Sequence, residues 1–166
     1  HETLASGGYS HAEGNLTKAS EFASHAEGDH AKATGQYSHA EGSDTEASGW
    51  ASHVEGYGTK ALKSYGHAEG NYARAEGKYS HAEGNQAHAL AEYSHAEGFY
   101  TNALGKSSHA EGNSTSASND YEHAQGIANY NSTNQIFSVG AGEVKDYYNV
   151  TRRNAISILS VPNAET

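Results

Sequence analysis

Small and polar residues alternate along most of this chain, in a pattern that repeats without interruption. The plainest copy reads Ser80-His81-Ala82-Glu83-Gly84. Side chains of a strand alternate between its two faces, so this pattern predicts a strand with one small-residue face and one polar face. A fixed period over most of a chain is typical of stacked repeat proteins, and it predicts an all-β solenoid. The histidine recurs every 14 residues, at His11, His25, His39, His53, His67, His81, His95, His109 and His123.

Each 14-residue unit divides into two halves that share the pattern Ser/Thr-x-Ala-x-Gly-x-x. In one unit the halves begin at Ser38 and Thr45. We expect each half to form five residues of strand and a two-residue turn, with the glycine easing the corner. Two strands per unit give a flattened coil with a small-residue interior, and successive coils stack in parallel about 4.8 Å apart. Nine such coils make a rod roughly 40 Å long.

The composition lacks the large side chains of a globular core. The chain has 19 Gly and 12 Tyr but no Cys or Met, and Leu, Ile, Val and Phe are scarce before its C-terminal fifth. Low hydrophobicity with a net charge of -10 is typical of disorder, but the strict spacing gives each residue a place in a repeating backbone. The absence of cysteine excludes disulfides and thiolate metal sites.

The charge and the length of the apolar runs exclude two classes of partner. The acidic balance argues against a nucleic-acid partner, because no basic patch is present to displace counterions from phosphates. No apolar run is long enough to cross a bilayer, so we expect no membrane insertion by this segment. Because His1 falls in the middle of a repeat, we expect the sequence to be a fragment of something longer.

The outward-facing positions predict which sheet contacts a partner. A coil of Ala, Ser and Gly buries little apolar surface, which favours oligomerisation. Outward positions vary in the second half-repeats, whereas the first half-repeats keep a His/Glu pair, changed to His/Gln only in the last. A sheet that faces water has no reason to keep one pair, so we predict a subunit interface there. This His/Glu face comprises His11, Glu13, His25, Glu27, His39, Glu41, His53, Glu55, His67, Glu69, His81, Glu83, His95, Glu97, His109, Glu111, His123, Gln125, Phe137 and Val139.

The same face turns apolar at the end of the array. Continuing the period past His123 reaches Phe137, and Val139 then falls in the glutamate column. We interpret this change as a dry plug that closes the subunit interface. The chain therefore divides into a β-roll at 1–135 and a C-terminal β cap or junction at 136–166.

The cap has its own pattern. An open solenoid end exposes unpaired strand edges, which is why a cap is expected. The sequence predicts a polar loop at 143–149 and a strand-rich segment at 150–161, which Pro162 ends.

The doubled half-repeat resembles the head repeats of YadA-type trimeric autotransporter adhesins. The resemblance covers residues 1 to about 142 and rests on the period and the small-residue positions. It implies a left-handed parallel β-roll that forms a homotrimer. That family usually has Val and Ile at the trimer centre, where this chain has His and Glu. Ser-His-Ala-Glu-Gly is also similar to repeats of phage and prophage tail fibres, in which strands similar to 136–140 and 152–158 precede a C-terminal chaperone or self-cleaving domain.

Known catalytic motifs are missing from the sequence. His-Ala-Glu copies part of the zinc deaminase signature, but its Cys-x-x-Cys partner is impossible without cysteine. The chain has no His-Glu-x-x-His, no Gly-x-Ser-x-Gly and no phosphate-binding glycine loop. An active site needs one special constellation, whereas this chain has nine near-equal ones. We therefore expect neither enzymatic activity nor a cofactor.

The His and Glu columns allow two interpretations. In the first, each histidine donates to a glutamate of a neighbouring coil or chain, and every buried group of a polar interface has a partner. In the second, rings of histidine around a threefold axis hold a metal ion, with His39, His81 and His95 as candidate ligands. A glutamate beside a histidine is also expected to raise the histidine pKa, which would make the interface sensitive to pH.

Tyrosines at turn positions are expected to stack along one edge of the coils, either as packing or as a surface for carbohydrate or a receptor. They are Tyr9, Tyr37, Tyr65, Tyr79, Tyr93 and Tyr121. An ice-binding solenoid needs an outward array of threonines, but the threonines of the repeats are expected to point inward. These are Thr17, Thr45, Thr59, Thr101 and Thr115.

Together the patterns predict a non-enzymatic, trimeric rod for surface attachment. As the head of a bacterial surface adhesin or as a phage tail fibre, it would be extracellular, at the bacterial cell surface or the virion tail. Its partners would be two further copies of itself and a host surface glycan or matrix protein. The alternative is a metal-loaded structural spike with the His columns as ligands. Residues expected to meet the host surface are Lys18, Lys32, Trp50, Lys60, Tyr72, Arg74 and Tyr100.

Overall fold

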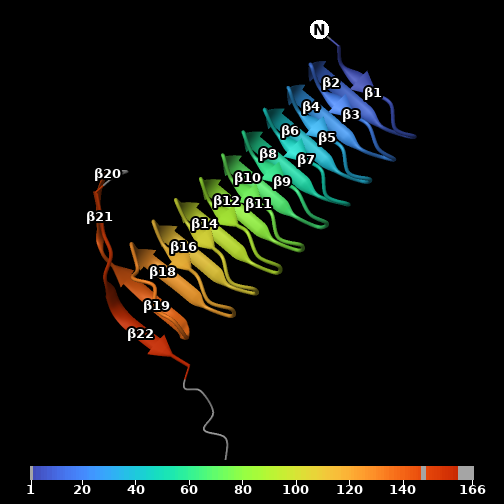
Figure 1. Ribbon diagram of the computed structural model, residues 1–166. Coiled ribbons are helices and arrows are strands. Elements are labelled where there is room, and N and C mark those ends of the chain that lie inside the picture. The colour runs from blue at the N-terminus through green and yellow to red at the C-terminus, as the bar shows by residue number, and fades with distance from the viewer. Residues whose placement is uncertain (1, 147–148, 161–166) are drawn as a thin grey trace, which may run out of the picture.

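A computed structural model, which describes residues 2–146 and 149–160, shows an all-β parallel solenoid of stacked coils (Figure 1). The described residues contain no helix, and so none that could cross a membrane. Each coil contributes one long and one short strand. The long strands are β2 (His11–Asn15), β4 (His25–Asp29), β6 (His39–Ser43), β8 (His53–Tyr57), β10 (His67–Asn71), β12 (His81–Asn85), β14 (His95–Phe99), β16 (His109–Asn113) and β18 (His123–Ile127). The short strands are β1 (Leu4–Ala5), β3 (Lys18–Ala19), β5 (Lys32–Ala33), β7 (Glu46–Ala47), β9 (Lys60–Ala61), β11 (Arg74–Ala75), β13 (His88–Ala89), β15 (Asn102–Ala103) and β17 (Ser116–Ala117).

The register of both sheets follows the 14-residue period. Long strands pair in parallel with long strands one coil away, so that His67 lies opposite His81 and Glu69 opposite Glu83. Short strands pair in the same way, forming a second sheet of nine strands. The predicted parallel solenoid with 14-residue, two-strand coils is therefore confirmed.

The lengths of the strands differ from the prediction. The long strand of one coil covers His81–Asn85, one residue later than expected, and its short partner covers only His88–Ala89. The residues between the short strand and the next long strand form a turn. The Ser94 hydroxyl closes this turn by donating a hydrogen bond to the Ala91 carbonyl at 2.6 Å. In six coils the serine that opens the pentapeptide thus closes a turn instead of beginning a strand.

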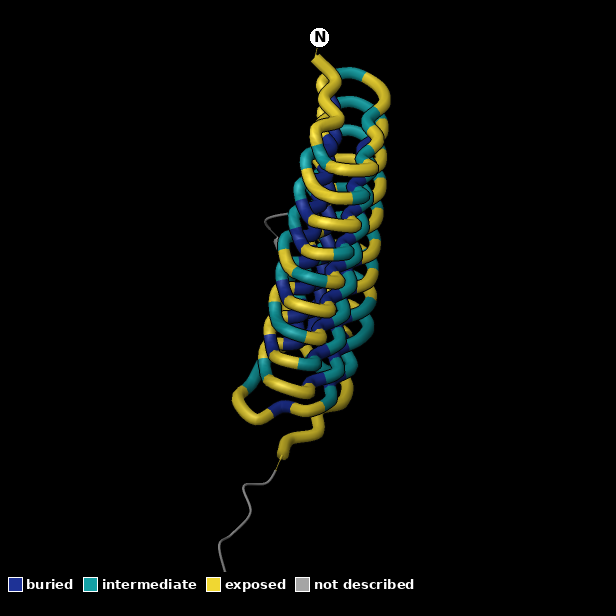
Figure 2. Tube along the Cα trace, turned by 90° about the vertical axis from the view of Figure 1, so that its right-hand side faces the viewer, coloured by how far each residue is buried: buried dark blue, intermediate teal, exposed yellow. Residues whose placement is uncertain are grey.

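The interior of the solenoid is built from small side chains, as predicted. Alanines of both sheets, such as Ala82 and Ala89, are fully buried, and they form one continuous core along the rod (Figure 2). Val54 takes an alanine position in this core and is also fully buried. The repeat threonines are buried as well, so they cannot form the outward array of an ice-binding surface.

Glycine is required where the long strand approaches its neighbour. Gly84 has φ +118°, in the region that disfavours L side chains, and an added Cβ would overlap the carbonyl oxygen of Gly98 on the next coil. The same contact recurs from coil to coil, which explains why the third residue after each repeat histidine stays glycine.

Aromatic rings stack along one edge of the coils. The rings of Tyr65 and Tyr79 lie 4.7 Å apart between centroids, and those of Tyr79 and Tyr93 lie 5.2 Å apart, which confirms the predicted stacking there. Trp50 extends the ladder, with its ring 4.9 Å from that of Tyr65. The sequence pattern missed this continuation, because Trp50 occupies the neighbouring turn position.

A C-terminal extension of the long-strand sheet follows the ninth coil. Strand β19 (Gln135–Ala141) pairs in parallel with β18, and β22 (Asn154–Leu159) pairs antiparallel with β19 at the end of the sheet. Phe137 lies opposite His123, as the period predicts. The strand-rich segment is confirmed at β22, and Pro162 lies outside the described residues.

A hairpin of β20 (Glu143–Asp146) and β21 (Asn149–Thr151) precedes β22 and lies beside the last coils (Figure 1). The expected polar loop at 143–149 is wrong for its first four residues and for Asn149, which lie in strands, and residues 147–148 lie outside the described residues. Val144 lies opposite Val150 across this hairpin, and that apolar pair favours strand over loop.

Candidate subunit interface

The histidines of the His/Glu face form one column on the outer side of the long-strand sheet. Parallel register places each imidazole beside the next, with ring centroids 4.6 to 5.0 Å apart. The column ends at His123, whose ring lies 5.7 Å from that of Phe137. The fold therefore brings together all nine repeat histidines and the phenylalanine that continues their period.

The glutamates form a second column beside the histidines. In six coils the histidine Nε2 lies 3.6 to 3.9 Å from the carboxylate two residues later on its own strand. His123, whose own strand carries Gln125, instead reaches back to Glu111 of the preceding coil at 3.7 Å. These separations exceed hydrogen-bond length, and exposed pairs of this kind contribute only about 0 to 1 kcal/mol each.

Several imidazoles leave hydrogen-bonding capacity unused. Within the described part of the chain, five buried Nε2 atoms have no hydrogen-bond partner. Leaving such an atom unpaired costs about 1 to 3 kcal/mol. The expectation that every buried group has a partner is therefore not met within one chain. These atoms belong to His25, His81, His95, His109 and His123.

The histidine column favours the neutral imidazole. Burial lowers the pKa of five central histidines from the ordinary value of 6.5, and the charge of the histidine on the next coil lowers it further. The glutamates act in the opposite direction but are outweighed, so the expectation of raised histidine pKa values is wrong here. The five residues are His53, His67, His81, His95 and His109.

One position of the column brings three potential metal ligands together. Among the described residues, donor atoms of His95, Glu97 and His109 lie within 4.8 Å of one another. Imidazole nitrogen and carboxylate oxygen suit zinc and related ions, and a lowered imidazole pKa keeps the nitrogen lone pair available. Of the ligands expected from the sequence, this group includes His95 but neither His39 nor His81.

The His/Glu face ends in an apolar patch that the repeat pattern revealed only in part. Phe137 lies opposite Ile158 and Val139 opposite Ile156, so all four side chains share one face of the sheet. Ile156 and Ile158 are 52% and 50% exposed. We call these four residues the end patch. The alternation Ile156-Ser157-Ile158 signals a strand with an apolar face, but the sequence does not show which strand it pairs with.

The outer side of the short-strand sheet has a different character. Its charges are mixed, and some are paired between coils, as in the 3.1 Å contact of the Lys60 Nζ with the Glu46 carboxylate. Within one coil, Arg74 pairs with Glu76. Lys18 and Lys32 are exposed. This side therefore has the mixed, partly paired charges of an ordinary solvated surface.

Comparison with known proteins does not assign the chain to a family. No protein-family model matches the chain, and no curated protein matches it.

Proposed function

We propose that this chain is a segment of a non-enzymatic, homotrimeric fibre that attaches a bacterial surface or a phage tail to its target. The observation that carries the proposal is the His/Glu face, which keeps one pair of side chains from coil to coil and ends in the end patch. The number of three chains and the extracellular location rest on the resemblance to YadA-type heads and tail-fibre repeats.

The energetics of the face favour a partner. Burying the exposed part of each side chain of the end patch yields about 1 kcal/mol. In a trimer this amounts to roughly 12 kcal/mol before the cost of association. A neighbouring chain also offers acceptors for the unpaired imidazole nitrogens, which removes a cost that a single chain bears.

The end patch also solves a problem of register. Identical His/Glu coils would allow neighbouring chains to slip by one or more repeats. The face changes from Glu111 through the neutral Gln125 to the apolar Val139, and it does so at one end only. Three chains bury all copies of the end patch only when they are aligned, so the patch selects one register.

Light scattering on the untagged chain at neutral pH, before and after chelation, tests the proposal. We expect a stable trimer that a chelator does not alter. Val139→Asp in the end patch should lower the mass in solution, while the circular dichroism of the β-roll stays unchanged. Lys32→Asp, on the outer side of the other sheet, is the matched control and should remain trimeric. A monomeric native chain would refute the interface.

The His95, Glu97 and His109 group favours a second candidate, a metal-loaded structural spike. In that case the chain would retain a stoichiometric ion after purification without an affinity tag. Chelation would dissociate the trimer, and His109→Ala would remove the ion.

A further inference from the structure

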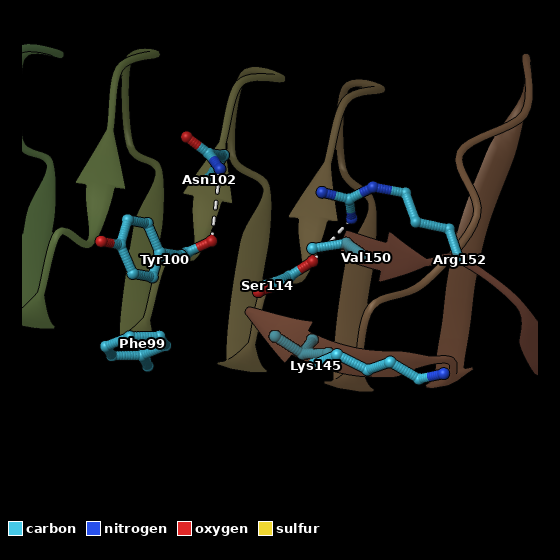
Figure 3. A pocket seen from close by; sticks show the side chains of 8 residues that line it. Phe99, Tyr100, Asn102, Ser114, Lys145, Val150 and Arg152 are labelled. Atoms are coloured by element: carbon cyan, nitrogen blue, oxygen red, sulfur yellow. Dashed lines mark hydrogen bonds between the residues drawn. The ribbon is translucent and has the colours of Figure 1, made fainter. Parts of the chain in front are cut away.

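A cavity of about 450 Å³ lies where the β20–β21 hairpin meets the edge of the solenoid (Figure 3). Its wall on the solenoid side comes from the corners of two successive coils, and its other wall comes from the hairpin and the residues that follow it. None of the lining residues belongs to the His/Glu face. Those that matter for its chemistry are Phe99, Tyr100, Asn102, Lys145, Val150 and Arg152.

Two aromatic rings form one side of the cavity. The centroids of Phe99 and Tyr100 lie 4.3 Å apart, and the rings are nearly perpendicular at 84°. Phe99 is 43% exposed, and the Tyr100 hydroxyl accepts a hydrogen bond from Gln86 at 2.8 Å, which holds the ring in place. The exposed Phe99 ring, packed against the fixed Tyr100 ring, can stack against the C–H face of a sugar.

One cation forms the other side. The guanidinium of Arg152 is anchored by a 2.6 Å hydrogen bond from its Nη1 to the Ser114 carbonyl (Figure 3). Lys145 also lines the cavity, but its side chain runs away from the aromatic rings in Figure 3, and its Nζ lies 3.8 Å from the Glu143 carboxylate. Among the described residues that line the cavity there is no aspartate or glutamate. The lining of this cavity is therefore positively charged, although the whole chain has a net charge of -10.

Two other hollows on the short-strand side of the solenoid lack this combination. Both are lined by Lys60 and Tyr72, so each has a cation beside an aromatic ring. The Lys60 Nζ is already paired with Glu46 at 3.1 Å, and Glu46 itself lines one of the hollows. The positive charge there is therefore compensated by the chain itself.

We infer that the cavity at the hairpin binds an acidic saccharide. Phe99 and Tyr100 stack against the sugar ring, Arg152 faces its carboxylate, and Asn102 meets its hydroxyl groups. The volume suits one or two sugar units. An acidic saccharide would be the ligand for the proposed attachment role, on which this assignment rests. The cavity itself lies within a single chain and does not require trimer formation.

The repeat supplies a matched control. Tyr57 occupies the repeat position of Phe99 three coils earlier, and its ring lies 5.2 Å from that of Tyr72 at 87°. Tyr57 therefore belongs to a similar perpendicular aromatic pair, but the hairpin with Lys145 contacts the later coil. Tyr57→Ala removes an aromatic corner without touching the cavity.

Isothermal titration of the native chain with sialyllactose, a glucuronate disaccharide and lactose tests the inference. We expect at least one acidic sugar to bind and lactose not to bind, with affinity falling as salt is added. Phe99→Ala and Arg152→Gln should each weaken binding roughly tenfold, the first through loss of a stacking contact and the second through loss of a charge-assisted contact. Tyr57→Ala should leave binding unchanged.

Three outcomes would overturn the inference. Neither acidic sugar binds at about 10 mM, well above a millimolar Kd; or lactose binds as well as the acidic sugars; or Tyr57→Ala weakens binding as much as Phe99→Ala. Light scattering on Phe99→Ala separates this result from the proposed function, because the variant should keep the oligomeric state of the native chain.

Discussion

Replacing the buried Thr59 with valine should stabilise the solenoid. Thr59 is fully buried, and among the described residues its Oγ1 has no hydrogen-bond partner. An unpaired buried hydroxyl costs about 1 to 3 kcal/mol, and valine keeps the branched shape without the hydroxyl. We therefore expect Thr59→Val to raise the free energy of unfolding by about 1 to 2 kcal/mol. Ala73 and Ala87 occupy the same column, so the position does not require a hydroxyl.

Thr115 provides the opposite case within the same column. It is also fully buried, but its Oγ1 donates to the Glu111 carbonyl at 2.9 Å. Thr115→Val leaves that carbonyl without its donor, and it should lower the free energy of unfolding by about 1 kcal/mol. The same chemical change should therefore have opposite signs at Thr59 and Thr115. For a chain of this size, 1 kcal/mol corresponds to about 2 to 4 °C in Tm.

Urea unfolding followed by circular dichroism, at one fixed protein concentration, measures both effects. The midpoint should rise for Thr59→Val and fall for Thr115→Val, with an unchanged slope. Thr101 also has an unpaired buried Oγ1, and it lies three coils from Thr59. The effects of Thr59→Val and Thr101→Val on the free energy of unfolding should therefore be additive. A midpoint for Thr59→Val as low as that for Thr115→Val would refute the reasoning.

Three further predictions concern pH, the glycine column and a buried carboxylate. Because burial lowers the pKa of central histidines such as His81 below 6.5, the unfolded chain binds more protons than the folded one. The urea midpoint should therefore be constant above about pH 7 and fall towards about pH 5, and a constant midpoint would contradict this. Gly84→Ala should destabilise the fold by at least about 2 kcal/mol in the same urea assay, because its φ is unfavourable and its Cβ meets Gly98. Glu122→Ala should cost about 2 to 3 kcal/mol, measured as a lower Tm, because the carboxylate accepts backbone N–H groups of Ser118 and Asn119 at 2.8 and 2.9 Å. Glu111→Ala, in the partly exposed glutamate column, is its control and should change Tm far less.

The sequence predicted the features that follow from repetition. A constant period places the same residue type at the same depth in every coil, so the parallel register and the small-residue interior could be read directly. The position of Phe137 opposite His123 followed from the same count. The boundaries of the strands were predicted less well, because the serine was assigned to a strand face although its hydroxyl closes the preceding turn.

The candidate interface was predicted less completely where the repeat ends. Ile156 and Ile158 join the end patch only through antiparallel pairing with β19, which no period specifies. The sign of the histidine pKa shift also depends on a balance that sequence does not contain. A nearby glutamate was visible in the pattern, whereas the stronger effect of burial between stacked coils was not.

Because identical coils stack in register, the length of the solenoid can change by whole coils. Adding or deleting 14 residues at any coil preserves every column, and it changes the reach of the rod by about 4.8 Å. An insertion within a strand whose length is not a multiple of 14 would put side chains of the wrong kind into the alanine interior. In the gene, such a step is a block of 42 nucleotides flanked by near-copies of itself, which recombination readily duplicates or removes. Solenoids of different length could thus arise in a lineage while the end patch and the hairpin cavity stay the same.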